Sequence, residues 1–160
     1  MMPVVYLGIG SNIGDKEANI TQALRLISKI CEVKKKSHLY HTEPIGNTEQ
    51  DWFLNCVVEI ETDIDPKHLL SSFKSIERTL GRIKTTKNGP RTIDIDILFY
   101  GTRIVKTKNL VIPHPLLQER LFVLQPMMDL NPDFVHPVLQ KPIQELYKNH
   151  PCKEKVLLYK

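Results

Sequence analysis

The chain has 160 residues, 41% of them hydrophobic and 25% charged, which is the composition of a globular protein and excludes a disordered one. The formal charge of +4 and the pI near 8.9 favour an anionic partner, although nucleotides, nucleic acid and acidic lipids all qualify. No apolar run approaches membrane-spanning length, and the first residues do not form a signal peptide. We therefore expect a single domain over residues 1–160, a monomer that works in the cytoplasm without a membrane.

The cysteines are Cys31, Cys56 and Cys152, an odd number with wide spacing and no CxxC pair. This pattern indicates neither a disulfide framework nor a zinc site, and it fits a reducing compartment.

The first third of the chain predicts a strand, a loop, a helix and a second strand. Residues 4–7 are apolar and predict a buried strand, and the glycine-containing residues 8–15 predict the loop after it. This loop matches neither GxGxxG nor a Walker A sequence, so a tight structural turn is favoured over a phosphate site. Residues 32–40 predict the second strand, and 42–51 a polar loop. The helix between them has an apolar stripe at helical spacing, made of Ile20, Ala23, Leu24, Ile27 and Ile30.

Residues 53–61 predict a third strand, because apolar side chains alternate with mixed ones. One face carries the core residues Leu54, Cys56, Val58 and Ile60, and the other carries Phe53, Asn55 and Glu59.

A second helix follows with clear boundaries. Asp65 is the predicted N-cap, Pro66 takes the first helical position, and Gly81 lies just past the end. Its core stripe is Leu69, Leu70, Phe73, Ile76 and Leu80.

The rest of the chain predicts a strand over residues 93–98, then a hairpin turn at 100–102 that leads into a strand at 104–105. Seven of the eleven prolines lie between Pro113 and Pro151, which predicts short helices and connecting loops. Together these elements predict an α+β fold, a ferredoxin-like αβ sandwich in which a mostly antiparallel sheet is covered by helices.

Asp94 and Asp96 are the most informative residues, since they stand two apart on the strand over residues 93–98. Alternation sends Ile93, Ile95 and Ile97 to the core and both acids to the other face, with their Cα atoms about 6.6 Å apart. Such a pair suits Mg²⁺ bound with substrate phosphates. The pattern equally allows a solvated strand face whose acids pair with Lys or Arg.

A basic segment precedes the acids. Between positions 74 and 91 a single acid, Glu77, stands against Lys74, Arg78, Arg82, Lys84, Lys87 and Arg91. Mixed Arg and Lys can position and neutralise a triphosphate, and residues 81–89 predict a loop that closes as a lid. His114 lies between two prolines and close to Arg120, so it is a further candidate phosphate contact. Phe53 beside Asn55 suggests a flat heterocycle held by stacking and hydrogen bonds.

These residues resemble those of the 6-hydroxymethyl-7,8-dihydropterin pyrophosphokinases of folate biosynthesis. The resemblance covers nearly the whole chain, and its most specific part is the motif Gly-Pro-Arg-x-x-Asp-x-Asp. The matching segments are Gly10-Ser11-Asn12, residues 40–46, Phe53-Leu54-Asn55, residues 89–98, Pro113-His114-Pro115 and Glu119-Arg120. It implies a ferredoxin-like αβ fold and transfer of pyrophosphate from ATP to the pterin hydroxymethyl oxygen, with two Mg²⁺ ions and release of AMP.

Position by position, the resemblance implies that Asp94 and Asp96 hold both Mg²⁺ ions and, with Arg82 and Arg91, form the catalytic set. The ATP-binding residues would be Lys74, Glu77, Arg82, Lys84, Lys87, Arg91, Ile97, His114 and Arg120. Phe53 and Phe122 would sandwich the pterin, while Asn55 and the backbone of Thr42, Glu43, Pro44 and Ile45 would read its ring edge. Asn88 stands where many members of the family have an aromatic residue, and Lys84 and Lys87 stand where they have arginines. These differences imply weaker closure of the lid and weaker binding of the ATP phosphates.

Two alternatives remain. A basic RNA-binding module on such a sheet would stack bases on exposed aromatic residues, although acids on a central strand repel a phosphate backbone. A second alternative keeps the enzyme class but changes the acceptor to another small heterocyclic alcohol. We expect ATP and a pterin as partners, and no nucleic acid.

Overall fold

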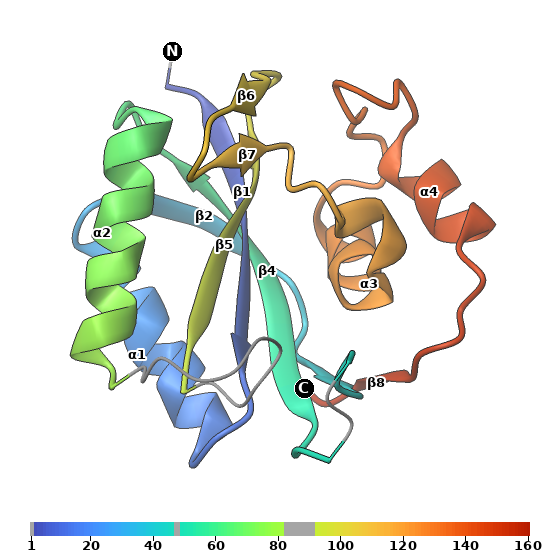
Figure 1. Ribbon diagram of the computed structural model, residues 1–160, viewed down its shortest axis with the longest axis horizontal. Helices are drawn as coiled ribbons and strands as arrows, with labels where there is room; N and C mark the ends of the chain where they lie inside the picture. Colours follow the sequence, from blue (N-terminus) through green and yellow to red (C-terminus); the bar gives the residue numbers. More distant parts are fainter. Residues whose placement is uncertain (1, 47–48, 82–91) are drawn as a thin grey trace.

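The computed structural model describes residues 2–46, 49–81 and 92–160, in which a sheet lies between two helical layers (Figure 1). Within these residues the sheet has six strands, and all of their pairings are antiparallel. The order is β5-β1-β4-β3-β8, with β2 also paired to β4. The strands are β1 Val4–Ser11, β2 Glu32–Lys36, β3 Tyr40–Thr42, β4 Phe53–Glu61, β5 Asp94–Tyr100 and β8 Val156–Leu158. This β-α-β-β-α-β arrangement is the ferredoxin-like αβ sandwich.

The central strand β1 is longer than its apolar start predicts, because it includes Gly8 and Gly10. The prediction that residues 8–11 belong to a loop was wrong. Both edges of β1 are paired, with β4 on one side and β5 on the other. These ladders outweigh the low strand propensity of glycine, a nonlocal effect.

The predicted strand over residues 32–40 is interrupted, because β2 ends at Lys36 and β3 begins only at Tyr40; both strands pair with β4. Ser37 fills the break: its backbone N–H donates to the Val57 carbonyl at 2.9 Å, and its hydroxyl accepts the Val57 N–H at 2.9 Å. The local irregularity therefore leaves β4 fully hydrogen-bonded at this point.

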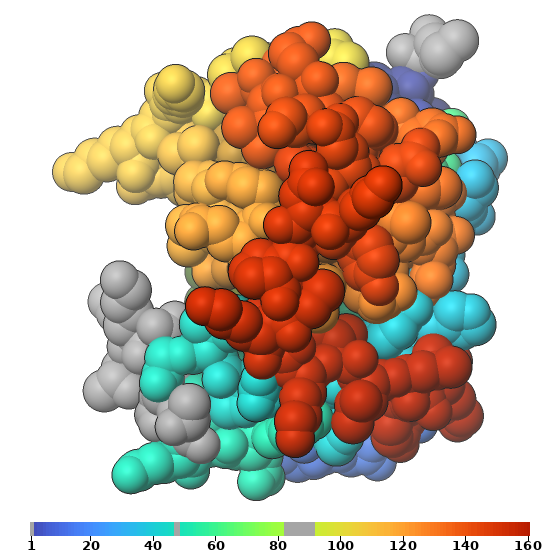
Figure 2. Space-filling view, turned by 90° about the vertical axis from the view of Figure 1, so that its right-hand side faces the viewer, coloured from blue at the N-terminus to red at the C-terminus, as the bar shows by residue number. Residues whose placement is uncertain are grey.

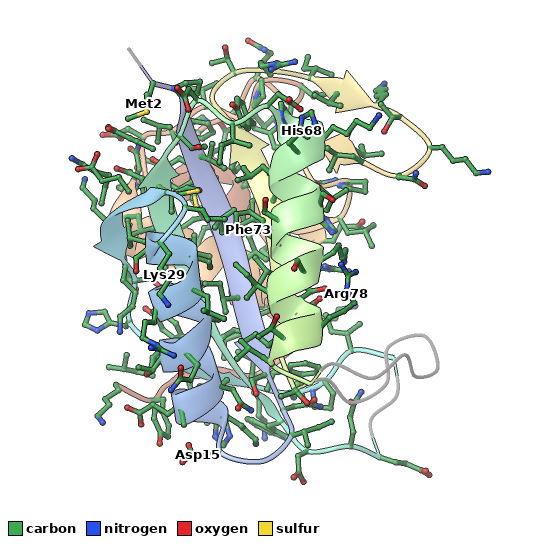
Figure 3. All side chains as sticks on the ribbon, turned by 90° about the vertical axis from the view of Figure 1, so that its left-hand side faces the viewer. Met2, Asp15, Lys29, His68, Phe73 and Arg78 are labelled. Carbon is green, nitrogen blue, oxygen red and sulfur yellow. The ribbon has the colours of Figure 1, made fainter. Side chains whose placement is uncertain are left out.

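Helices α1 Lys16–Ser28 and α2 Pro66–Thr79 cover one face of the sheet, and Phe73 lies on the sheet side of α2 (Figure 3). The predicted punctuation of α2 is confirmed, because the Asp65 carboxylate accepts two N–H groups of the first turn and Gly81 follows with φ of +90°. The prediction for Ile30 was wrong, since it lies beyond α1 and is exposed. The core of this layer includes Leu7, Ile9, Ile20, Ile27, Leu54, Ile60, Leu69, Phe73, Ile93, Ile95 and Ile97.

The other face of the sheet is covered by the C-terminal third of the chain, which Figure 2 shows from outside. Its elements are the 3₁₀ turn Leu117–Glu119 and the helices α3 Leu121–Leu130 and α4 Ile143–Asn149. A second core forms there from Tyr6, Val57, Leu98, Phe99, Leu117, Val123, Leu124, Met127, Ile143 and Leu146. The sheet is therefore buried on both faces.

The turn after β5 forms as predicted, with the Arg103 N–H donating to the Tyr100 carbonyl at 3.0 Å. The strand that follows does not pair with β5, however. Strand β6 Val105–Lys106 pairs instead with β7 Val111–Ile112 in a separate hairpin. None of the helices in the described part of the chain is both long and apolar enough to span a membrane.

Candidate active site

Two glycines of β1 form the floor of a cleft on the α3 side of the sheet. Gly8 lies between Val57 of β4 and Asp96 of β5, and Gly10 lies between Asn55 and Asp94. Because these glycines carry no side chains, the surface between the acids and the aromatic end of β4 is hollow. The cleft, open mouth included, has an empty volume of about 770 Å³.

The acid pair lies on one face of β5, as the alternation predicts. Asp94 and Asp96 line the cleft, while Ile93, Ile95 and Ile97 belong to the opposite core. Burial, and then the charge of Asp94, raise the pKa of Asp96. A site that disfavours two neighbouring negative charges favours a cation between them.

Cationic groups surround the acids and act in the opposite direction. The charges of Arg120 and Lys74 lower the pKa of Asp96, while that of Glu77 raises it. These side chains come from α3's N-terminus and from α2, so the fold brings together groups far apart in sequence.

Glu77 is a buried carboxylate that joins α2 to β5. It accepts the backbone N–H of Ile95, the residue between the two acids, at 2.7 Å. Lys74, one turn earlier, approaches its other oxygen at 3.3 Å. Glu77 thus fixes the position of the acid-bearing strand.

His114 lies close enough to the acid site for the charges there to affect it. Burial, and then the Arg120 charge, lower its pKa to about 4, and Asp94 acts in the opposite direction. Its Nδ1 accepts the Leu116 N–H at 3.3 Å, which leaves the proton of the neutral ring on Nε2. His114 is therefore a neutral donor.

The other end of the cleft combines an aromatic ring with a fixed amide. Asn55 donates from Nδ2 to the Thr42 hydroxyl at 2.7 Å, a buried bond that orients its amide. Phe53 lies on the same strand, and Phe122 faces the cleft from α3 with the Arg120 guanidinium 5.5 Å from its ring centroid. Two rings and a held amide are the groups that a flat, polar-edged ligand needs.

The structure brings most of the candidate residues to one place. The cleft lining includes Thr42, Glu43, Ile45, Phe53, Asn55, Asp94, Asp96, Arg120 and Phe122. Lys74, Glu77 and His114 adjoin the acids without lining the cleft.

Two candidates lie elsewhere. Pro44 is not part of the cleft lining. The side chain of Ile97 packs into the core on the opposite face, because odd-numbered residues of β5 point away from the acids. Arg82, Lys84, Lys87, Asn88 and Arg91, and with them the proposed lid, lie outside the described residues.

Sequence reasoning missed Gly8 and Gly10 as part of the site. Their spacing could have revealed them, because two glycines two residues apart in a strand lie on the same face. This pattern is recognisable only if the predicted strand is extended through both glycines. Val57, Leu98 and Val123 also line the cleft and carry no motif.

Asp94 and Asp96 have the chemistry of ligands for a divalent cation. Asp94 and Asp96 offer carboxylate oxygens beside a cleft, and Mg²⁺ commonly uses one or two carboxylates together with substrate phosphates. No cluster of three or more His, Cys, Asp or Glu side chains that could hold a metal occurs among residues 2–46, 49–81 and 92–160. The pair therefore fits a metal that arrives with a phosphate ligand.

A family model described as 7,8-dihydro-6-hydroxymethylpterin-pyrophosphokinase matches residues 6–132. The 2-amino-4-hydroxy-6-hydroxymethyldihydropteridine pyrophosphokinase of Aquifex aeolicus is 38% identical over 152 residues, covering 95% of each chain. The enzyme of the same name from Bacillus subtilis is 42% identical over 132 residues, 81% of this chain and 79% of the relative.

Some relatives are much longer. The folic acid synthesis protein FOL1 of Dictyostelium discoideum is 45% identical over 92% of this chain, but the chain spans only 22% of that protein. Among solved structures, the Plasmodium falciparum HPPK-DHPS with pteroate matches with a TM-score of 0.74 at 18% identity, covering 92% of this chain and 42% of that one. This last match shows the fold alone.

The family model spans most of the chain, and the Aquifex relative matches it almost from end to end. The chain therefore belongs to the 7,8-dihydro-6-hydroxymethylpterin pyrophosphokinase family, ATP-dependent enzymes of folate biosynthesis.

Proposed function

We propose that this chain transfers pyrophosphate from ATP to the hydroxymethyl oxygen of 6-hydroxymethyl-7,8-dihydropterin in the cleft over Gly8 and Gly10. The products are AMP and the pterin diphosphate. The observation that carries the proposal is that one cleft holds an acid pair at one end and a ring-and-amide site at the other.

The pterin would lie between Phe53 and Phe122. Asn55, whose amide is fixed by Thr42, would read the polar edge of the ring. In this orientation the hydroxymethyl group would point along the cleft floor toward Asp94 and Asp96.

The triphosphate would lie against Arg120, His114 and Lys74, with Arg82, Lys84, Lys87 and Arg91 completing the nucleotide site. Arg and Lys neutralise charge on the phosphate oxygens, and the neutral His114 ring can donate from Nε2.

Asp94 and Asp96 would hold two Mg²⁺ ions. Bound there, the ions would neutralise the triphosphate and polarise the attacking hydroxyl. The protein's own groups align the pterin hydroxyl with the β-phosphorus, exclude water, and stabilise charge with Arg120. We assign no side chain as general base, since positioning and charge stabilisation account for most phosphoryl transfer.

The single domain would comprise residues 1–160, because both cores pack on one sheet. The pterin remains the preferred acceptor over another heterocyclic alcohol because the family's name specifies it.

Incubation of the protein with Mg-ATP and the hydroxymethyl dihydropterin, followed by separation of the products, tests the proposal. We expect stoichiometric AMP and pterin diphosphate. Asp94→Asn and Asp96→Asn should each lose activity by at least about a thousandfold, whereas Asp63→Asn, an exposed acid away from the cleft, should retain it. Failure to form AMP, or salt-sensitive RNA binding with indifference to Mg-ATP, would contradict the proposal.

A further inference from the structure

The segment after α4, residues 150–158, connects the two walls of the cleft but does not line it. One wall is the start of α3, and the other is the Thr42–Glu43 segment. In Figure 1 this segment leaves α4 and runs to β8 beside the sheet. We call it the C-terminal strap. It lies beyond residues 6–132, the part that matches the family model.

At its start the strap binds the 3₁₀ turn that precedes α3. His150 Nδ1 accepts the Cys152 N–H at 2.9 Å, so Nε2 carries the proton of the neutral ring and donates to the Glu119 carbonyl at 3.0 Å. The same Nε2 lies 3.4 Å from Glu154 Oε1. The His150 ring therefore anchors the start of the strap to the turn before α3 and borders the Glu154 carboxylate.

Glu154 caps α3. Its Oε1 accepts the Leu121 N–H at 2.8 Å, and Leu121 lies between Arg120 and Phe122. Helix α3 has no side-chain cap of its own and no acid in its first turn. The positions where a capping residue would normally stand are occupied by residues that line the cleft, so the cap comes from 33 residues away.

At its end the strap holds the opposite wall. The Lys155 N–H donates to Glu43 Oε1 at 2.8 Å, and the Lys155 carbonyl accepts the Glu43 N–H at 3.1 Å. Strand β8 then pairs with β3, which ends at Thr42, the partner of Asn55. Successive residues of the strap, Glu154 and Lys155, thus bind the two walls between which the cleft opens.

We infer that Glu154 is a positioning residue that sets the spacing between Phe122 on α3 and the Thr42–Glu43 wall, and so determines the affinity for the pterin. The inference rests on the proposed function, since it assigns the aromatic end of the cleft to the pterin. Glu154 touches no substrate and acts through Leu121.

The test compares Glu154→Ala with Asp65→Ala. Both remove a helix N-cap, but Asp65 caps α2 and does not line the cleft. Binding is measured by fluorescence titration with the pterin, and separately with a nonhydrolysable ATP analogue. We expect the pterin dissociation constant of Glu154→Ala to rise about fivefold, and that of the nucleotide, which His114 and Lys74 contact besides Arg120, to rise less. Asp65→Ala should lower thermal stability without altering either constant, and Glu154→Gln, which keeps an acceptor, should restore pterin binding.

Equal changes in the dissociation constants of both ligands would overturn the inference, as would an unchanged pterin dissociation constant in a folded Glu154→Ala. Should that variant not fold, amide exchange of the wild type decides: pterin binding must slow exchange at Leu121 and Lys155, and unchanged rates there would overturn the inference. A wild type that neither binds nor converts the pterin would instead refute the proposed function.

Discussion

At the scale of single residues, Gly10 shows how closely the cleft floor approaches its ligand-binding groups. A Cβ at this position would lie 2.3 Å from Asn55 Oδ1, a distance that requires the amide to move. Gly10→Ala should therefore break the bond from Asn55 to Thr42 and cost about 1–3 kcal/mol of unfolding free energy. Pterin affinity should fall at least about tenfold. Denaturant unfolding and pterin titration measure the two effects.

Gly8 supplies the matched comparison for folding. A Cβ there would meet Leu98 at 3.5 Å, an ordinary van der Waals distance. Gly8→Ala should thus change the unfolding free energy by less than about 1 kcal/mol. Equal destabilisation of the two variants would show that the approach of Asn55 is not what requires glycine at position 10.

Asp96 illustrates a conflict between stability and function. Burial and the Asp94 charge raise its pKa, so the ionised form is disfavoured in the folded protein without a bound cation. Asp96→Asn should therefore stabilise the metal-free protein on the order of 1 kcal/mol at neutral pH, while removing activity. Thermal unfolding in a chelator, with Asp63→Asn as the comparison, measures this. A destabilised Asp96→Asn would mean that the carboxylate is satisfied within the fold itself.

At the scale of elements, Glu77 couples a helix to the acid-bearing strand. Because its carboxylate accepts the Ile95 N–H, Glu77→Leu should leave that buried donor unpaired and cost about 1–3 kcal/mol. Glu77→Gln retains an acceptor and should lose less. Because Glu77 fixes the strand that carries Asp94 and Asp96, Glu77→Leu should also weaken binding of Mg²⁺ with an ATP analogue, measured by calorimetry. Equal stability of the two variants would contradict this role.

The same scale explains which elements the sequence predicts. Helix α2 was predictable because Asp65, Pro66 and Gly81 act on their immediate neighbours. The acid pair was predictable because period-two alternation is local to β5. The extension of β1 through Gly8 and Gly10 was not, since it depends on pairing with β4 and β5. Strand β8 and the β6–β7 hairpin likewise depend on partners that no local pattern specifies.

At the scale of the whole molecule, the C-terminal third both completes the site and buries the second face of the sheet. The Tyr6 hydroxyl donates to Glu59 at 2.9 Å and accepts from Asn131 at 3.2 Å, which ties the end of α3 to the sheet. Arg120 and Phe122 belong to the same layer. Stability of this layer and integrity of the cleft should therefore vary together.

His136 makes that layer sensitive to acid. The residue is buried, and its Nδ1 accepts the Val138 and Leu139 N–H groups at 3.1 Å and 3.0 Å, so the folded state requires the neutral ring. Burial lowers its pKa below the ordinary value of 6.5. Below about pH 6.5 the unfolded chain gains a proton at this residue that the folded chain does not, and stability falls as the pH falls, by at most about 1.4 kcal/mol per pH unit.

His136→Asn isolates this contribution, because an asparagine oxygen can accept the same two N–H groups and does not titrate. At pH 7.5 the variant should match the wild type within about 1 kcal/mol. Between pH 6.5 and 5 its unfolding free energy should decline less steeply than that of the wild type, because the other histidines with lowered pKa values, His41 and His114, are common to both proteins. Parallel declines in urea unfolding across this range would show that His136 does not carry the acid sensitivity of the C-terminal layer.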